Sequence, residues 1–396
     1  MTIRTNVPGA TNFALQSAIG AYSDEAYTTA KKLNSTALVG SNPQIDTSTE
    51  TFIGQMRWFK PISSLQINVA SLTDPTDGTP NTYSSDYLKY IKTVRTYGGD
   101  KINMQQVVTQ QDGLAKIGRD FGESRAQDEH NAILAVLKGV ALSEALLGAA
   151  AASGATGLGG QTFANDPNDM KYGFYVDLGT AKNIVDATAT VQGAARAEGF
   201  LRAFGMAYKD YEPDYAYMVV SPETLASLRS ANLVDQTTVT EGNVTFSTIF
   251  GGKFRLIQTR ASQGFTAAEL TKINTGAGVD ITGTKCTYIV LPGSIAMEAL
   301  AVPDPVEIAR LPAKYKGGGT TSIWHRWGYV AHPAGYSWGG SEDAFPSDAN
   351  FYDAMEGGTQ KALASVASGT LAATAGVWTR KTSSALSLGI LPIFHS

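Results

Sequence analysis

The segment Gly335-Tyr336-Ser337-Trp338-Gly339 has the residue types and the spacing of a serine-hydrolase nucleophile elbow. In that motif the serine stands on a sharp turn between a buried strand and a helix, and an acid and a histidine follow it along the chain. A strand before Pro333 fits this pattern, because Trp327, Tyr329 and Val330 suit a pleated surface. The first question for this chain is whether Ser337 is a nucleophile.

The residues after the elbow argue against that role. Residues 340–346 show no apolar repeat at helical spacing and end in a proline, so the expected helix is missing. Asp343 or Asp348 could serve as the acid, but the only downstream histidine is His395, one residue from the end of the sequence. Terminal residues are usually poorly tied down. A serine hydrolase that uses Ser337 therefore remains only a remote alternative.

Other chemical signatures are weak. His325 and His332 are seven residues apart, which does not place them on one face of a strand, and nothing in the spacing joins them to Asp304 in a metal site. The sequence contains no phosphate-binding glycine loop of the usual kinds. The single cysteine, Cys286, excludes an internal disulfide and is interpreted as a small buried hydrophobe in a strand. We predict no catalytic, cofactor-binding or metal-binding residues.

The composition favours a protein that is covered by other subunits. Of the 396 residues, 43% are hydrophobic and only 17% are charged, below the usual fraction of about 25%. A surface with few charges is often buried in an assembly. The net charge of −4 argues against sequence-specific nucleic-acid binding as the main role, although weak local contact with DNA stays open. No apolar stretch reaches the roughly 18 residues of a membrane span.

The N-terminal quarter predicts an arm followed by a hairpin. Residues 1–50 are polar and weakly periodic, which indicates an extended arm with at most a short helix at about 24–33. Strand-like runs within 52–69 and at 90–97 flank a turn cluster at 74–81. A two-stranded ribbon is marginally stable alone, so we expect it to lie on a neighbouring subunit.

A long helix is the clearest prediction. Gln111–Leu147 contains no proline and is rich in helix-forming residues, so it predicts a helix about 50 Å long. Apolar residues mark its two ends, whereas residues 122–131 are strongly polar. We expect the ends to anchor on a sheet, the middle from Glu123 to Asn131 to face a surface of the assembly, and His130 to be solvated.

An α/β region should follow a flexible loop at 148–160. A helix is expected at 181–210 and a strand at 215–220, and the next helix, at 221–229, should begin at Ser221 as its N-cap with proline in the first turn. Further strands are expected at 244–249, 254–259, 288–291, 295–300 and 306–310.

The order of these parts resembles the tailed-bacteriophage major capsid (coat) protein family, which has the Hong Kong 97-type fold. The resemblance is most specific at Tyr217–Leu225, at Thr284–Ala299 and at Trp324–Trp338, which ends in the family's His-Pro-x-Gly-Tyr-Ser-Trp run. Trp378–Lys381 and Leu388–Leu391 are similar to the family's last strands. They are displaced by an extra Ala/Thr/Gly-rich stretch at about 355–376.

The resemblance implies an α+β fold with an N-terminal arm, an extended hairpin loop, a long spine helix and a central axial domain. The implied division, in chain order, is an arm, the hairpin loop, a peripheral domain with the spine helix, the axial domain, return strands of the peripheral domain and a C-terminal segment: 1–50, 51–104, 105–180, 181–300, 301–345 and 346–396.

The implied function is that of a major capsid protein that self-assembles, as pentamers and hexamers, into the icosahedral virion shell around double-stranded DNA. Implied partners are a portal protein, a separate scaffold protein, an optional decoration protein, and packaged DNA, which the shell contacts without sequence specificity. The resemblance also implies assembly in the host cytoplasm without a membrane. Another encapsulating-shell or phage structural protein remains the alternative. The inter-subunit contact candidates are Trp58, Phe59, Ile62, Lys89 and Lys92. Some family members cross-link lysine to asparagine, but lysines on a ribbon are more simply solvated edge residues.

Overall fold

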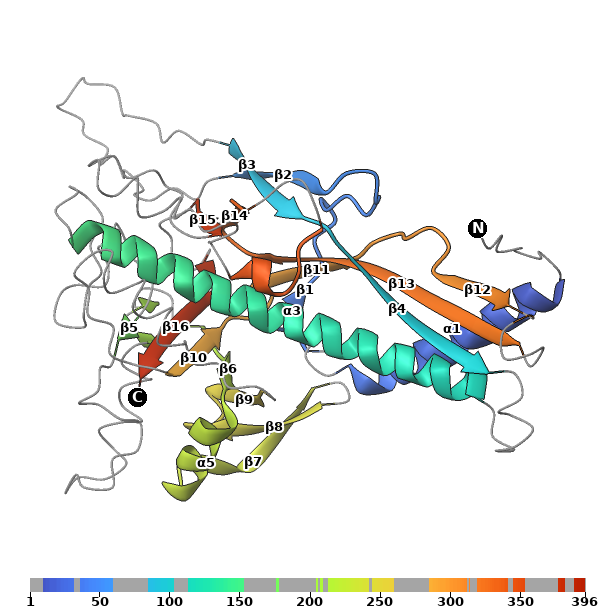
Figure 1. Cartoon of the computed structure of the whole chain (residues 1–396). Coiled ribbons are helices and arrows are strands. Elements are labelled where there is room, and N and C mark those ends of the chain that lie inside the picture. Colours follow the sequence, from blue (N-terminus) through green and yellow to red (C-terminus); the bar gives the residue numbers. More distant parts are fainter. Residues whose placement is uncertain are drawn as a thin grey trace, which may run out of the picture.

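Figure 1 presents the computed structural model of the whole chain. The structure describes residues 10–31, 36–59, 85–102, 113–152, 176–177, 204–205, 207–208, 213–241, 244–259, 285–311, 313, 319–340, 345–352, 377–381 and 388–395. The predicted hairpin turn at 74–81, almost all of the predicted helix at 181–210 and the insert at 355–376 lie outside these residues. The described elements form a mixed α+β architecture, as the sequence predicts.

One long helix, α3 (Gly113–Ala152), runs across the molecule and past both large sheets (Figure 1). Its 40 residues correspond to about 60 Å at 1.5 Å per residue. The predicted continuous helix is confirmed, and it continues into the stretch that was expected to be a loop. Ile133, Val136, Leu137 and Val140 are fully buried, so the C-terminal half of the helix is part of the main core.

A five-stranded sheet is built around β13 (Thr320–Pro333), the strand that contains most of the Trp324–Trp338 segment. β11 (Ile295–Ala299) and β12 (Val306–Leu311) pair antiparallel with β13, and β1 (Val39–Gly40) extends the sheet beyond β11. β4 (Thr93–Ile102) also pairs antiparallel with β13, over Thr320 to Tyr329. The strands predicted at 295–300 and 306–310 are thereby confirmed.

Side chains of β13 alternate between two differently covered faces. On one face Trp327 and His325 contact α3, through Asp128 and Phe121 respectively. On the other face Val330 packs in a small cluster with residues of the hairpin described below. We call this second face the open face, because α3 does not cover it.

A seven-stranded sheet forms the second body. Its order is β5 (Val176–Asp177), β16 (Ile390–His395), β10 (Lys285–Val290), β6 (Ala216–Val220), β9 (Phe254–Gln258), β8 (Val244–Ile249) and β7 (Val234–Glu241). The predictions for β6, β8, β9 and β10 are confirmed, whereas β7 was not predicted. Helix α5 (Pro222–Ser230) starts as expected, since the Ser221 side chain accepts a hydrogen bond from the Thr224 amide at 3.1 Å.

The C-terminal strand is not loose, contrary to the expectation for His395. β16 lies inside the seven-stranded sheet and pairs with β10 in antiparallel register from Lys285↔His395 to Val290↔Ile390. His395 is 1% exposed, and its Nε2 lies 2.9 Å from the Thr287 hydroxyl. The end of the sequence therefore contributes core packing, which nearness to the terminus alone does not reveal.

The predicted hairpin is present, but its second strand ends earlier than expected. β2 (Ile53–Phe59) and β3 (Ser85–Ile91) pair antiparallel from Ile53↔Ile91 to Phe59↔Ser85. The strand predicted at 90–97 is divided, because β3 stops at Ile91 and β4 begins at Thr93 in the five-stranded sheet. The turn at Lys92 thus separates the hairpin from the sheet.

The prediction of an extended arm is wrong for residues 10–30, which form a helix. α1 (Ala10–Ala30) packs along the first half of α3 and runs in the same direction. The sequence did not show this helix, because its contact with α3 depends on backbone approach at Gly118 and Gly122 rather than on an apolar stripe. Neither α1 nor any other described helix is long and apolar enough to cross a membrane.

The rest of the arm is a strap that connects the two sheets. The Ala37 amide donates to Glu241 of β7 at 2.9 Å, and the Ala37 carbonyl accepts from the Gly293 amide at 2.7 Å. Further along, the Asn42 amide donates to Glu298 of β11 at 2.7 Å, and the Thr47 carbonyl accepts from Ala301 at 2.9 Å. Residues 36–48 therefore hold together parts of their own chain.

Candidate functional site

Ser337 does not lie on a nucleophile elbow. It belongs to β14 (Tyr336–Trp338), which pairs antiparallel with β15 (Trp378–Arg380), so a strand and not a helix contains it. The serine is 5% exposed, and its hydroxyl accepts a hydrogen bond from the Lys89 amide at 3.0 Å. His395 lies in the seven-stranded sheet, and Asp348 pairs with Arg95. Ser337 therefore connects the hairpin to the last strand pair.

His325 and His332, the two histidines that a metal site would need, lie on opposite faces of β13. His325 stacks on Phe121 on the α3 face, whereas His332 contacts Tyr90 and Trp378 on the open face. Among the described residues, no three His, Cys, Asp or Glu side chains are grouped as a metal site. Cys286 is buried in β10, as expected, and burial raises the pKa of its thiol.

The base of the hairpin packs on one half of the open face. Met56, Leu88 and Tyr90 of the hairpin are buried against Val330 of β13 and Leu300, together with Ile45 of the strap. Trp58, Val94, Ala296 and Val302 are partly buried around this cluster. We call this half of the open face the covered half, since the chain covers it with its own hairpin.

Lys92 stabilises the junction between the hairpin and the sheet. Its side chain is 0% exposed, and its ammonium donates to Asp46 Oδ2 at 2.8 Å and to the Ser48 carbonyl at 2.7 Å. The Lys92 ammonium, together with the hydroxyl and the amide of Ser48, holds the pKa of the Asp46 carboxyl well below its ordinary value. The interpretation of ribbon lysines as solvated edge residues is therefore wrong for Lys92, whose partner comes from the distant strap.

The other half of the open face carries an exposed tryptophan. Trp324 is 38% exposed and lies over Gly98 of β4, where an added Cβ would come 2.7 Å from the indole ring. Thr96 and Asp100 share this face of β4 and are exposed. Arg326 forms an ion pair with Glu307 at 2.5 Å beside the indole. We call Trp324, Gly98, Thr96, Asp100, Glu307 and Arg326 the tryptophan platform.

Part of the polar middle of α3 contacts other elements of the same chain, whereas the prediction that it faces a surface of the assembly stays a prediction. Glu129 is 3% exposed and accepts from Arg125 at 3.0 Å and from the Tyr27 hydroxyl of α1 at 2.6 Å. Asp128 accepts from the Trp327 indole at 3.0 Å and from Arg95 at 3.3 Å. Glu123 and Asn131 are exposed, and Ser124, Arg125, Gln127, Asp128 and His130 are half-buried. The polar stretch is therefore divided between internal contacts and an accessible surface.

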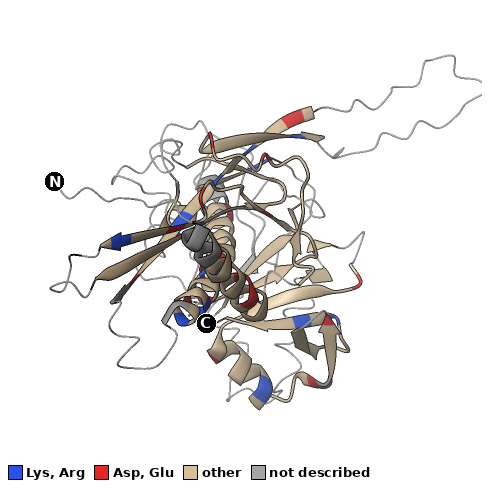
Figure 2. Ribbon diagram, turned by 90° about the vertical axis from the view of Figure 1, so that its right-hand side faces the viewer, with Lys and Arg blue, Asp and Glu red and all other residues tan. Residues whose placement is uncertain are grey.

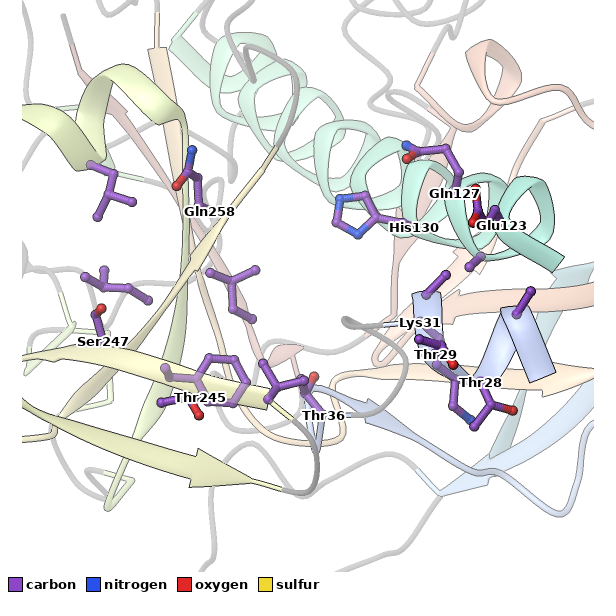
Figure 3. A pocket seen from close by; sticks show the side chains of 18 of the residues that line it. Thr28, Thr29, Lys31, Thr36, Glu123, Gln127, His130, Thr245, Ser247 and Gln258 are labelled. Atoms are coloured by element: carbon purple, nitrogen blue, oxygen red, sulfur yellow. The ribbon is translucent and has the colours of Figure 1, made fainter. Parts of the chain in front are cut away.

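A groove separates the α1–α3 pair from the seven-stranded sheet (Figure 3). Its volume is about 1150 Å³. Figure 3 shows Glu123, Gln127 and His130 of α3 and Thr28 of α1 on one side. The opposite wall is more apolar, with Leu225, Val244, Phe246, Leu256 and Ile257. His130, expected to be fully solvated, is half-buried at this groove.

The predicted contact residues are distributed over different environments. Trp58 is half-buried beside the hairpin cluster, Phe59 is the last residue of β2, and Lys89 lies on β3 next to β14. Ile62 lies outside the described residues. Sequence reasoning missed Trp324 and also Tyr87, which is 52% exposed on β3. A glycine in the strand opposite Trp324 was the available signal, since such glycines mark close approach of another group.

Among solved structures, the chain is similar to phage capsids. The matches include the capsid of Ralstonia phage GP4, with 11% identity over 75% of this chain and 83% of that chain and a TM-score of 0.46. The Cyanophage Pam1 capsid matches at 9% identity, 78% and 87% coverage and 0.44. The head structure of Helicobacter pylori bacteriophage KHP40 matches at 8% identity, 93% and 91% coverage and 0.42. No protein-family model and no curated protein matches the chain.

Proposed function

We propose that this chain is a major capsid protein of the Hong Kong 97-type fold, which self-assembles into the icosahedral shell that encloses double-stranded DNA. The observation that carries the proposal is the division of the open face. The chain covers one half with its own hairpin and leaves the tryptophan platform exposed on the other half. An exposed tryptophan on the face of a sheet is a typical anchor of a protein–protein contact.

The platform has the properties of a contact between copies. A large aromatic anchor such as Trp324 is typical of the energetic centre of an interface, and charged residues such as Glu307 and Arg326 suit its rim. Charged residues, coloured blue and red on the ribbon of Figure 2, are sparse along the described elements, in agreement with the charged fraction of 17%. We infer that a second copy covers the platform.

The hairpin of that second copy is the occupant that we propose. In Figure 1, β2 and β3 lead away from the part of the sheet where β12 lies, so a subunit's own hairpin base leaves the platform uncovered. Trp58, Phe59, Ile62 and Lys89 remain the hairpin residues assigned to the contact, and exposed Tyr87 joins them. Lys92 acts differently, because it fixes the hairpin base within its own subunit.

A structural role accounts for Ser337 and the histidines better than catalysis does. Ser337 accepts from a backbone amide of the hairpin, and His332 and His395 are packed in the interior. These contacts give each residue a function in joining elements. We therefore propose no enzymatic activity, and a serine hydrolase remains the remote alternative.

The proposed assembly is a closed shell of pentamers and hexamers, since closed symmetry leaves no unsatisfied contact. The five-stranded sheet with α3 would form the peripheral domain, and the seven-stranded sheet would form the axial domain. The 346–396 segment would contribute β16 to the seven-stranded sheet and β15 to the strand pair with β14. Proposed partners are a portal protein, a separate scaffold protein, an optional decoration protein, and packaged DNA in the virion, with assembly in the host cytoplasm.

Electron microscopy of the expressed protein tests the assembly. Closed shells are expected from the wild type, and dispersed subunits from Trp324→Ser, while Trp324→Phe should still assemble because it keeps an aromatic ring. Circular dichroism should show the same fold in all three. Tubes or dispersed globules from the wild type would favour another phage structural protein. Closed shells that still lack a portal vertex when the portal protein is co-expressed would favour an encapsulating shell.

A photo-crosslinking amino acid at position 324 tests the occupant. In shells mixed from ¹⁴N and ¹⁵N subunits, crosslinks to residues 53–91 should join a light to a heavy copy. Crosslinks only within one copy, or only to residues outside the hairpin, would overturn the assignment of the hairpin as the partner of the platform.

A further inference from the structure

His332 lies at a joint of three elements on the covered half of the open face. Its ring is 6.5 Å from the ring of Tyr90 on β3 and 5.6 Å from the ring of Trp378 on β15, with both contacts edge-on. The residue is 2% exposed. The imidazole therefore fills the space between the hairpin base, β13 and the last strand pair.

Both aromatic neighbours are fixed in place. The Tyr90 hydroxyl accepts from the Asp46 amide at 2.7 Å, and the Tyr90 ring occupies the space that a Cβ at Gly54 would need. The Trp378 indole donates to the Phe351 carbonyl at 3.1 Å, and its backbone amide donates to the Ser143 hydroxyl at 3.1 Å. A protonated His332 ring would therefore lie between two aromatic rings that cannot move away without breaking these contacts.

The charged groups on the surrounding elements are already paired. Lys92 at the hairpin base pairs with Asp46 of the strap at 2.8 Å, and Arg380 of β15 pairs with Glu144 of α3 at 3.2 Å. On β3 itself, Asp86 lies 3.7 Å from Lys381. Tyr336, which follows β13, has a pKa well above its ordinary value because it is buried. An imidazolium ion would gain no uncommitted carboxylate among these groups.

We propose that His332 is a proton-operated release for the hairpin, which keeps the hairpin base docked when neutral and frees it when protonated. A buried charge without a counter-ion must reach water. The hairpin side yields first, because Tyr90 belongs to the small cluster with Met56 and Leu88, whereas Trp378 belongs to the main core. This inference does not depend on capsid assembly, although in a shell the released hairpin would loosen a contact between copies.

The acid range follows from the burial of the ring. Burial lowers the pKa of His332 from 6.5 to about 4 in the docked state. In the released state we expect the ordinary value. The release equilibrium should therefore rise by about tenfold for each pH unit below about 6.5 and level off near pH 4, where both states are protonated.

His325 provides a matched control on the same strand. Burial and Arg125 lower its pKa to about 4, and Asp24 opposes them. Its ring stacks on Phe121 of α3 at 5.4 Å, on the face away from the hairpin. Protonation of His325 should weaken the contact between β13 and α3 and leave the hairpin base docked.

Amide hydrogen exchange, corrected for the intrinsic pH dependence, tests the release. In the wild-type protein, Leu88–Ile91 should lose protection between pH 6.5 and 4 while Met218–Val220 of β6 keeps it. His332→Gln should abolish that change, as should His332→Phe if the glutamine variant does not fold, and His325→Gln should preserve it. A wild-type hairpin that stays protected at pH 4 would overturn the proposal.

Direct titration gives an independent reading. The chain has four histidines, so ¹³C NMR of imidazole-labelled protein can assign the His332 signal by comparison with His332→Gln. Its midpoint should coincide with the pH at which Leu88–Ile91 becomes exchangeable. Hairpin release at the same pH in the His332→Gln or His332→Phe protein would place the trigger elsewhere and refute the role of this residue.

Discussion

Gly122 of α3 lies against the backbone of Ser23 in α1: a Cβ added to Gly122 would come 2.2 Å from the Ser23 carbonyl oxygen. One turn earlier, a Cβ on Gly118 would come 2.9 Å from the Cβ of Tyr22. Residues four apart share a helix face, so the two glycines form a flat strip on which α1 rests. The N-terminal helix is therefore positioned by the absence of side chains.

We predict that Gly122→Ala displaces α1 from α3. The added methyl group must push backbone atoms apart, and such overpacking costs typically about 1–3 kcal/mol. The free energy of unfolding from urea titration should fall by this amount, and limited proteolysis should cut within Ala10–Ala30. Gly20→Ala is the matched control, because nothing lies within 4 Å of a Cβ there. Equal stability of Gly122→Ala and wild type would contradict the close approach.

The Lys92–Asp46 pair predicts which of two substitutions destabilises the protein more. Asp46→Ala should destabilise the protein more than Lys92→Met, because the first change leaves a buried ammonium without its carboxylate, whereas the second keeps the apolar stem and removes the charge. Urea unfolding at neutral pH measures both changes. The reverse order would mean that the Ser48 carbonyl alone is enough to hold Lys92.

The same pair predicts a direction with pH. The folded-state pKa of Asp46 is depressed below its ordinary value of 3.8, so its stabilising contribution is present above pH 3.8 and is lost as the pH falls further. Asp46→Asn should lack this component of acid destabilisation. A comparison of urea midpoints for Asp46→Asn and wild type between neutral pH and pH 3 would detect it, and parallel curves would exclude it.

Elements with local signals could be predicted from the sequence. Ser221 with a proline after it marks the start of α5, and the β-branched and aromatic residues of 244–249 mark β8 at its observed limits. The pattern of α3 is equally local, because it lacks proline over its whole length. Each of these signals concerns the conformation of a few neighbouring residues.

What escaped prediction depends on partners that are distant in the chain. The burial of Glu129 requires Tyr27, which lies 102 residues away, and that of Lys92 requires Asp46, 46 residues away. The exposure of Trp324 could not be inferred from its type, since a tryptophan in a strand rich in aromatic residues is usually expected inside. Only the pairing of β13 with β4 places Gly98 beneath it.

Ser337→Ala should leave the fold and assembly intact. The loss of the acceptor for the Lys89 amide should cost about 1 kcal/mol, the usual contribution of one hydrogen bond. Urea unfolding measures that cost, and electron microscopy checks the particles. A serine-reactive fluorophosphonate should not label the wild type. Stoichiometric labelling at Ser337, absent from Ser337→Ala, would restore the hydrolase alternative.

The final prediction concerns the continuity of α3. Ala126 is 6% exposed and lies where α1 crosses the helix, near Gly122 and Arg125. Ala126→Pro would remove a helix hydrogen bond and introduce a ring clash, at a cost of about 3 kcal/mol or more. It should also disturb the Asp128–Arg95 ion pair, which fixes α3 to the sheet, and the hydrogen bond from the Tyr27 hydroxyl to Glu129, which fixes α3 to α1. Electron microscopy should then show soluble subunits, aggregates or irregular particles. Ala126→Ser, which keeps the backbone geometry, should form uniform particles. If Ala126→Pro particles matched the wild type in diameter and heat resistance, an unbroken α3 would not be what sets the subunit shape.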